Sequence, residues 1–364
     1  MNSTELTAKI SKVAEKFGIN GINDIETCNI GHINGTFFAQ SDKGHLVVQR
    51  INHNVFKDPA ALMDNIIAVT DHIRKKMENE GASAEEIERS VMRFYPAKDG
   101  KYYAIDENGE YWRICKFIEG TCTYNSGSAE MLYQAGLGFG KFQRYLSDFP
   151  ARELTETIPN FHDTAVRFAH FEETVAADAF NRADACRDLI EKVLSYKDTA
   201  KEIVSKLASG EIPYRVTHND TKINNVLIDV KTGESVCVVD LDTVMPGSLL
   251  YDFGDAIRAG ASAVPEGSLE FDKFAVREDL YKAFYDGFSL GIGDSITENE
   301  KNLLPLSAFM MTYEVGMRFL DDYLSGDTYF HTDYAGQNLD RARGQLALAD
   351  DIMKKKDILL AIAK

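Results

Sequence analysis

The chain has few cysteines, a shortage of basic charge and no long apolar run, and each shortage argues against a class of protein. Its five cysteines are odd in number and scattered, with no CxxC pair, so a reduced compartment is expected and a zinc site is not. A formal net charge of −17 argues against nucleic-acid binding through a broad basic face. The longest apolar run, near residues 303–311, is too short to span a bilayer.

What remains is the composition of an ordinary globular protein. The 364 residues are 44% hydrophobic and 27% charged, enough for a sizeable core and for two or three domains. The polar segment Met1–Glu5 lacks the basic and apolar stretches of a secretory signal. We therefore expect a cytoplasmic protein that does not interact with a membrane.

The order of apolar patterns predicts an α+β protein with two lobes, a small β-rich lobe followed by a larger helical one. Strand-like segments and a helical stretch indicate a small β-rich N-lobe over residues 1–118. Residues 119–364 are mostly helical and form the predicted C-lobe. Ligand pockets favour such domain junctions, so a cleft is expected there. The predicted strands cover residues 36–39, 45–49 and 111–118, and the predicted helices cover 5–17, 60–80, 130–147, 182–207, 276–288, 298–324 and 340–362.

A string of polar residues between apolar runs carries the chemistry. Asp220 follows His218 by two positions, Asn225 comes five residues later, and Asp240 ends the apolar run at 236–239. Phosphoryl transfer from Mg-ATP to a hydroxyl needs this set of groups. One carboxylate orients the attacking hydroxyl and takes its proton, while an amide oxygen and a second carboxylate hold metal ions against the phosphates.

A predicted hairpin relates two of these residues in space. The β-prone runs at 226–228 and 236–239 flank a turn-type segment at 231–234 that contains glycine. If the hairpin is symmetric about Thr232 and Gly233, Asn225 lies opposite Asp240, close enough to share a metal ion. Alternation along the strand would then place Asp242 on the same face as Asp240. The pairing depends on this register.

A glycine-containing segment near the N-terminus is a candidate phosphate loop. Gly31, Asn34, Gly35 and Thr36 lie in the stretch GHINGT, between two strand-like segments. Glycines let a backbone approach phosphates closely, and successive N–H groups can cradle them. His32 could contact a ligand. The alternative is a simple turn with local hydrogen bonds, because the stretch is neither GxGxxG nor a P-loop.

Two further patterns allow more than one interpretation. Asp252-Phe253-Gly254 spells the metal motif of protein kinases, but it opens a predicted helix, so we expect Asp252 to cap that helix or to brace the catalytic loop. Glu314 and Arg318 are four residues apart in a helical stretch and could form an ordinary ion pair. Alternatively, Arg318 could hold a polar substrate or a phosphate.

The chain resembles the aminoglycoside phosphotransferase-like kinases, which share the protein-kinase-like fold. Within that family it is similar to the bacterial N-acetylhexosamine 1-kinases. The resemblance spans nearly the whole chain and rests on several long segments, namely GHINGT at 31–36, WRICKFIE at 112–119, ETI-FHDT at 156–164, RVTHNDTKINN at 215–225, DLDTVMPGS at 240–248, DFGD-IR at 252–258 and GMRFLDDYLSGD-YF at 316–330.

This resemblance implies ATP- and Mg²⁺-dependent phosphorylation of the anomeric hydroxyl of N-acetylglucosamine or N-acetylgalactosamine. It implies that Asp220 is the catalytic base and contacts the substrate, and that Asn225 and Asp240 bind metal. Asp242, which the predicted strand places on the same face as Asp240, is expected to support a second metal ion or its waters. Phe117 and Ile118 fall at the adenine-binding hinge. His32, Thr243 and Arg318 fall at positions of sugar contacts, which favours Arg318 as a site residue. We expect a monomer.

One feature departs from the wider kinase pattern. The strand that should carry a phosphate-binding lysine reads Val47-Val48-Gln49-Arg50, so either Gln49 takes that place or Arg50 compensates. No glutamate stands in the segment 64–67 to pair with it. Alternative functions are a kinase for an aminoglycoside, choline or homoserine, a protein kinase, and a nucleotide-binding module without catalysis. A protein kinase would need an activation segment and an APE-like anchor after Asp240, and the sequence has neither.

Overall fold

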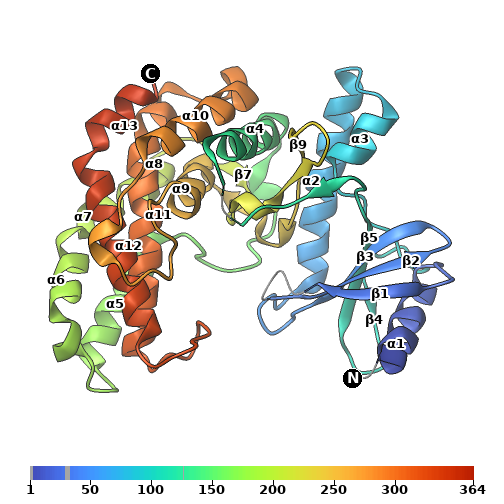
Figure 1. Cartoon of the computed structure of the whole chain (residues 1–364), viewed down its shortest axis with the longest axis horizontal. Helices are drawn as coiled ribbons and strands as arrows, with labels where there is room; N and C mark the ends of the chain where they lie inside the picture. Colours follow the sequence, from blue (N-terminus) through green and yellow to red (C-terminus); the bar gives the residue numbers. More distant parts are fainter. Residues whose placement is uncertain (1–2, 29–32, 126) are drawn as a thin grey trace. The chain divides into compact units, whose positions relative to one another are not determined.

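The computed structural model describes residues 3–28, 33–125 and 127–364. Its backbone divides into two compact units, each assembled from separate segments of the chain (Figure 1). The β-sheet N-terminal region and the helical C-terminal region confirm the predicted α+β class. The roles predicted for residues 1–118 and 119–364 remain predictions. Unit 1 contains Met1–Cys122, Leu154–Ile158 and Leu227–Val244, and unit 2 contains Thr123–Glu153, Pro159–Val226 and Met245–Lys364.

Unit 1 is built on a five-stranded antiparallel sheet with strand order β1-β2-β3-β5-β4. The strands are β1 (Asn23–Cys28), β2 (Gly35–Ser41), β3 (Gly44–Ile51), β4 (Ala104–Ile105) and β5 (Tyr111–Lys116). The helices of this unit are α1 (Ser3–Lys16), α2 (Pro59–Asn79) and α3 (Ala84–Ser90). The predicted strands at 36–39, 45–49 and 111–118 thus correspond to β2, β3 and β5.

The two faces of this sheet carry different kinds of side chain. Leu46 and Val48 of β3 and Ile114 of β5 form one core with the apolar side of α1. Because strand side chains alternate, Gln49 and Arg113, which are directly paired in the register, point to the opposite face. On that face the Sδ atom of Met63 in α2 lies 3.8 Å from Nη1 of Arg113. The α2 side of the sheet therefore carries polar groups as well as core.

The predicted hairpin exists, but its register was wrong. Strands β8 (Val226–Asp229) and β9 (Ser235–Val238) are neighbours in a second sheet, after β6 (Thr121–Cys122). The Asp229 N–H donates to the Glu234 carbonyl and the Gly233 N–H donates to the Asp229 carbonyl, both at 2.9 Å, so Asp229 lies opposite these two residues. Symmetry about Thr232 and Gly233 would have placed it opposite Val236. The Asp229 side chain accepts from the N–H groups of Lys231 and Thr232, and these local bonds determine the turn.

The predicted strand position of the two aspartates was also wrong. Strand β9 ends at Val238, and a short 3₁₀ helix, η4 (Leu241–Thr243), follows it. Asp240 precedes η4 in the left-handed conformation, with φ of 60°. Asn225 ends another short helix, η3 (Ile223–Asn225), just before β8 begins. Neither residue belongs to the β8–β9 ladder, so strand pairing does not relate them.

Unit 2 consists mainly of helices around the long helix α11 (Figure 1). Helix α11 is buried along most of its length and packs against α5, α9 and α12. A two-stranded antiparallel sheet joins β7 (Arg215–Thr217) to β10 (Met245–Gly247). The helices are α4 (Ala129–Tyr145), α5 (Thr164–Ala177), α6 (Arg187–Ser195), α7 (Lys197–Ala200), α8 (Glu202–Ser209), α9 (Leu249–Gly260), α10 (Glu278–Ile292), α11 (Glu298–Leu324), α12 (Gln337–Lys354) and α13 (Lys356–Ile362).

Two of the predicted long helices are interrupted. The stretch predicted at 182–207 forms α6, α7 and α8 after the short 3₁₀ helix η2 (Ala183–Cys186). Tyr196 lies at the first break, where its hydroxyl donates to Asp350 and its ring packs against Phe309 and Tyr313. These tertiary contacts override a continuous helical pattern. The stretch predicted at 340–362 breaks at Lys355 into α12 and α13.

Among the residues described, no helix is both long enough and apolar enough to cross a bilayer.

The closest helix packing in unit 2 depends on glycine. A Cβ atom on Gly287 of α10 would lie 2.0 Å from the Tyr133 carbonyl oxygen of α4. We predict that Gly287→Ala lowers the free energy of unfolding by about 3 kcal/mol, because the two backbones must separate. Gly267→Ala is the matched control, since nothing lies within 4 Å of its Cβ position. Chemical denaturation of both variants measures the difference, and equal stability would contradict the packing argument.

Candidate active site

The segment that carries Asp220 starts from an anchored strand. Strand β7 is fully buried, and the Arg215 guanidinium forms a two-bond ion pair with Glu300 at 2.6 and 2.7 Å. Thr217 pairs with Met245 of β10 and donates its hydroxyl to the Met245 carbonyl. The chain therefore leaves β7 at a defined place and direction before it turns into residues 218–225, which are the predicted catalytic segment.

Asp252 holds the first turn of that segment. Its carboxylate accepts the N–H groups of His218 at 3.0 Å and Asn219 at 2.8 Å, and also the Gln143 amide at 2.6 Å. Burial raises the pKa of Asp252, although these hydrogen bonds oppose the shift. The brace interpretation of Asp252 is confirmed, and the N-cap interpretation is wrong, because Ser248 caps α9 and Asp252 lies one turn inside it.

Asp220 and Asn225, two of the predicted site residues, are in contact within this segment. The Asn225 amide donates to the Asp220 carbonyl oxygen at 2.7 Å and lies 3.3 Å from its carboxylate. Lys222 Nζ lies 2.8 Å from Asp220 Oδ1. Burial works against it, but the Asp220 carboxylate raises the pKa of Lys222, so its ammonium group stays charged. The Asp220 carboxylate is part exposed and has a fixed cation beside it.

A second carboxylate fixes the middle of the segment. Asp255 Oδ2 accepts the Thr221 N–H at 3.1 Å, and Asp255 Oδ1 accepts from Arg258 Nε at 2.8 Å. Burial alone would raise the pKa of Asp255, but the Arg258 guanidinium holds it below its ordinary value. Two buried aspartates one turn apart in α9 thus position the backbone on both sides of Asp220.

His162 connects this segment to a pocket in the same unit. One ring nitrogen lies 3.3 Å from the Asn219 carbonyl oxygen, and the other lies 2.8 Å from Glu314 Oε1. Glu314 is completely buried, and Thr164 also donates to it. The predicted Glu314–Arg318 ion pair does not form, since Glu314 pairs with His162 and lies 3.6 Å from Arg167 Nε.

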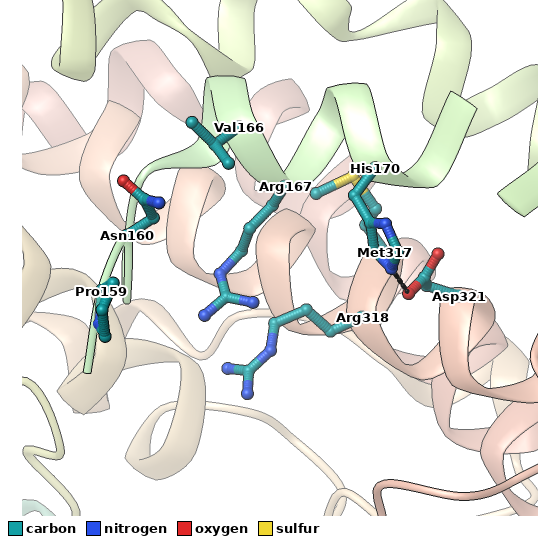
Figure 2. A pocket seen from close by; sticks show the side chains of 8 residues that line it. All are labelled: Pro159, Asn160, Val166, Arg167, His170, Met317, Arg318 and Asp321. Atoms are coloured by element: carbon teal, nitrogen blue, oxygen red, sulfur yellow. Dashed lines mark ion pairs between the residues drawn. The ribbon is translucent and has the colours of Figure 1, made fainter. Parts of the chain in front are cut away.

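The pocket lies between α5, α11 and the segment before α5 (Figure 2). The Arg167 and Arg318 guanidinium groups extend into the same part of it. Arg167 also donates to the Phe161 carbonyl at 2.7 Å. Among the described residues, Arg318 has no carboxylate within ion-pair distance. The pocket is lined by Pro159, Asn160, Val166, Arg167, His170, Met317, Arg318 and Asp321.

Aromatic rings determine the position of the Arg318 guanidinium. Its centre lies 5.9 Å from the Phe161 ring, 5.8 Å from Tyr329 and 5.5 Å from Phe330, all within cation–π range. The loop carrying Tyr329 and Phe330 is tied to the buried Asp322, which accepts both of their N–H groups. The guanidinium can therefore keep its donors directed at a ligand.

Unit 1 brings together another group of predicted residues. Asn34 donates to Asp242 at 2.5 Å, and Gln49 donates to Thr36 at 3.1 Å. Asp242 also contacts the buried Arg113, with 2.5 Å between Oδ1 and Nη1. Gly35 begins β2, Asp240 and Thr243 lie at η4, and Phe117 and Ile118 follow β5 directly. Gly31 and His32 lie outside the described residues.

Several residues of this arrangement were not predicted as site residues, although the sequence contained signals for some of them. Arg113 is a charge inside the otherwise apolar run 111–115, and such a charge requires a buried partner. Lys222 stands two positions after Asp220. His162 and Arg167 belong to the segment of chain around 156–167, which carries no obvious motif apart from the resemblance.

Among the described residues, no group of three His, Cys, Asp or Glu side chains is placed to hold a metal ion by itself. A preformed all-protein metal cage is therefore absent from this part of the chain. A metal ion bound here would need amide, water or substrate oxygens to complete its coordination.

Several solved structures share this fold across almost its whole length. An aminoglycoside phosphotransferase from Alicyclobacillus acidocaldarius matches with a TM-score of 0.61 and 13% identity, covering 97% of this chain and 94% of its own. A microcompartment-associated aminopropanol kinase matches with a TM-score of 0.56 and 13% identity, covering 97% and 98%. The GDP complex of aminoglycoside 2′-phosphotransferase-IIIa matches with a TM-score of 0.57 and 12% identity, covering 95% and 99%.

These similarities identify the kinase-like fold of aminoglycoside phosphotransferases. The sequence identifies the family itself, since the model of the phosphotransferase enzyme family APH matches residues 24–277, well over half of the chain. The chain belongs to this family, and the protein is a phosphotransferase.

The brace on the catalytic segment generates a prediction. Asp252→Asn replaces one acceptor oxygen with an N–H₂ group that faces buried donors, so the free energy of unfolding should fall by about 2 kcal/mol. The amide hydrogens of His218 and Asn219 should also exchange faster with solvent. Hydrogen-exchange mass spectrometry and thermal unfolding measure the two effects. The exposed Asp286→Asn serves as control, and unchanged protection in Asp252→Asn would disprove the brace.

Proposed function

We propose that the protein transfers the γ-phosphoryl group of ATP to the anomeric hydroxyl of an N-acetylhexosamine and releases the sugar 1-phosphate and ADP. The observation that supports this most directly is the pocket with the Arg167 and Arg318 guanidinium groups, joined to the catalytic segment through His162. Both features belong to one unit of the structure. The long resemblance segments point to the same activity.

The charge of the pocket favours an uncharged, oxygen-rich acceptor. The Asp321 carboxylate is paired with His170 at 3.5 Å, and Glu314 is buried behind Arg167, so the two guanidinium groups dominate the open space. A guanidinium donates hydrogen bonds and cannot accept them, which suits hydroxyl and acetamido carbonyl oxygens. An ammonium group would meet charge of its own sign. Aminoglycoside and choline acceptors, the alternative for this phosphate machinery, are therefore disfavoured.

Asp220 is the proposed catalytic base and orients the acceptor hydroxyl. The Asn225 amide holds its backbone, and Lys222 keeps a positive charge beside the carboxylate. The hydroxyl proton moves to Asp220 as the oxygen attacks the phosphorus and the bond to the leaving ADP oxygen breaks. Because the transition state is loose, positioning and charge stabilisation contribute more than the strength of the base.

Magnesium fits the donor set that is proposed for it. The Asn225 side-chain nitrogen donates to the Asp220 carbonyl oxygen, so the amide oxygen is the atom of that side chain left to bind a metal ion. Asn225 and Asp240 would each offer a hard oxygen of the kind that Mg²⁺ prefers, and substrate phosphates and water would complete the coordination of the ion. When bound, the ion neutralises charge on the phosphates. The sequence also predicts Asp242 as a residue of this metal site.

The nucleotide is proposed to bind along β2, β3 and the residues after β5. Asn34, Gly35, Thr36 and Gln49 would lie near the phosphates, together with Gly31. Phe117 and Ile118 would contact the base. The Phe117 ring stacks on His45, with centroids 4.0 Å apart, which gives this position a fixed aromatic surface. His32 and Thr243 complete the proposed sugar contacts.

A substrate panel tests the assignment. We expect the protein with Mg-ATP to phosphorylate N-acetylglucosamine or N-acetylgalactosamine at C1, as identified by ³¹P and ¹³C NMR of the product. The panel contains free hexosamines, hexoses, choline, homoserine and an aminoglycoside, with GTP as a second donor. Phosphate on C6, or turnover only with a cationic acceptor, would overturn the proposed function.

Replacement of the catalytic base provides a second prediction. Asp220→Asn should retain ATP binding, because the carboxylate acts on the acceptor, and should lose turnover by a factor of about 10³. Isothermal titration with ATP and a coupled ADP-release assay separate the two properties. Asp286→Asn, an exposed change on α10, should match the wild type in both. Near-wild-type sugar phosphorylation by Asp220→Asn would exclude Asp220 as the base.

A further inference from the structure

Unit 1 contains a fully buried arginine inside an apolar strand. Arg113 of β5 lies between Trp112 and Ile114, and all three are at most 2% exposed. Its side chain lies on the face of the sheet opposite α1, level with Gln49 of β3. An unpaired charge in such a place would be strongly destabilising, so the partners of Arg113 show what it contributes.

Two polar side chains and one ring lie against the Arg113 guanidinium. Its Nη1 lies 2.5 Å from Asp242 Oδ1, and its Nε donates to Gln49 Oε1 at 2.9 Å. The guanidinium centre lies 5.7 Å from the Phe94 ring. Asp242 is itself only 3% exposed, so the two charges form a buried ion pair. It connects the central sheet to the short helix η4.

The hydrogen bonds around this pair close into a ring. Gln49 continues from Arg113 to the Thr36 hydroxyl at 3.1 Å, and Asp242 Oδ2 accepts from Asn34 at 2.5 Å. Asn34 and Thr36 are two residues apart at the start of β2. The ring therefore begins and ends on the segment that is the candidate phosphate loop. Asn34 is additionally held by the Asn52 N–H, which donates to its side-chain oxygen at 2.9 Å.

The lysine and glutamate that the sequence lacks would normally act in this part of a kinase. Gln49 is one of the two residues that could have replaced the lysine, and its side chain binds Thr36 and Arg113. The other, Arg50, is about half exposed, and its Nε lies 3.9 Å from Glu110. In the helix α2 the segment 64–67 offers Asn65, whose amide donates to the backbone carbonyls of Thr155 and Val244. None of Gln49, Arg50 and Asn65 provides a buried cation with a carboxylate partner.

We propose that the Arg113–Asp242 pair replaces the missing lysine–glutamate pair as the positioning element of the nucleotide site, an inference that rests on the proposed function. Arg113 and Asp242 hold the Asn34–Thr36 segment on one side and η4 on the other. Helix η4 follows Asp240, whose left-handed conformation fixes where its carboxylate leaves the chain. Asp242 acts as the counterion of Arg113, and Asp240 is the metal ligand of this segment.

The pair has a property that distinguishes it from two independent contacts. Removal of one partner leaves a buried uncompensated charge, whereas removal of both leaves a neutral site. Arg113→Met and Asp242→Asn should therefore each weaken nucleotide binding, and the double variant should be less impaired than the product of the two single effects. Gln49→Met interrupts the ring without burying a lone charge, so it should show a smaller effect of the same kind.

Nucleotide binding without acceptor provides the main readout. The dissociation constant of a fluorescent ATP analogue is measured with Mg²⁺ titrated from zero, and KM and kcat follow in the kinase assay. We expect each single variant to raise the dissociation constant and the KM for ATP about 10-fold or more. The KM for the acceptor should change by less than about two-fold, and the half-saturating Mg²⁺ concentration should stay as in the wild type.

Two comparison variants define the alternatives. Asp240→Asn, the proposed metal ligand, should raise the half-saturating Mg²⁺ concentration strongly. Arg74→Met removes a part-buried arginine of the same unit that donates to the Val91 and Met92 carbonyls, and it should lower stability while nucleotide affinity stays unchanged. Arg113→Lys preserves the charge and shows whether affinity survives when the fork of donors is lost.

Several results would overturn the proposal. An Mg²⁺ requirement in Asp242→Asn as high as in Asp240→Asn would make Asp242 a metal ligand. Wild-type nucleotide affinity in Gln49→Met and Arg113→Lys, or additive losses in the double variant, would reduce the pair to a structural contact. If the wild type binds ATP and phosphorylates no sugar, the acceptor assignment fails, and the binding series still decides the role of Arg113.

Discussion

The Asp252 carboxylate is the constraint on which the catalytic segment depends. A loop cannot hold a functional carboxylate in place unless its own backbone N–H groups are satisfied, and those of His218 and Asn219 lie in the interior. Asp252 satisfies both from within α9, and Asp255 does the same for Thr221 one turn later. The position of Asp220 thus follows from a helix that contacts no substrate in the proposed mechanism. Three hydrogen bonds, from the N–H groups of His218, Asn219 and Thr221, attach the loop to that helix.

Within each unit, buried ion pairs lie beside segments that carry predicted site residues. Arg215 with Glu300, Arg258 with Asp255, and Arg113 with Asp242 are all nearly inaccessible to solvent. Such pairs contribute little net stability, because the cost of desolvation is close to the gain from attraction. Their benefit is geometric, since a pair that loses one member leaves a costly lone charge. The loop after β7, the start of β2 and η4 are each held in one arrangement by this penalty.

The sequence predicted the parts of the structure that depend on local pattern. Apolar periodicity located β2, β3, β5 and most long helices. The prediction was wrong at one turn and left open at Asp252, for different reasons. The turn after β8 is set by local side-chain bonds of Asp229, which a symmetric hairpin ignores. For Asp252 the sequence allowed a helix cap or a brace, because the backbone N–H groups that decide between them lie 33 and 34 residues away.

Arg113 shows the limit of the same reasoning in a different way. A single charge in a strand of Tyr, Trp, Ile and Cys signals a buried partner, but the signal does not say which carboxylate it is. The partner, Asp242, is 129 positions further along the chain. In the sequence, Asp242 also lies in an apparent continuation of β9. Strand alternation there would have placed its side chain on the same face as that of Asp240. The left-handed Asp240 ends that alternation, and this conformation is uncommon enough in a non-glycine residue that the letters alone do not predict it.

In the proposed function, the acceptor is selected by a pocket on α5 and α11. The chain carries a net charge of −17, so a cationic acceptor would be attracted to most of its surface. The pocket reverses that field locally with Arg167 and Arg318, and it keeps the second guanidinium between three aromatic rings rather than beside a carboxylate. A guanidinium placed on ring faces keeps all its donors available in the plane, directed toward oxygen atoms. Under the proposed function, selection against ammonium groups needs no clash of shape. It follows from two guanidinium groups in one pocket, where the Asp321 carboxylate lies against His170 and Glu314 is buried behind Arg167.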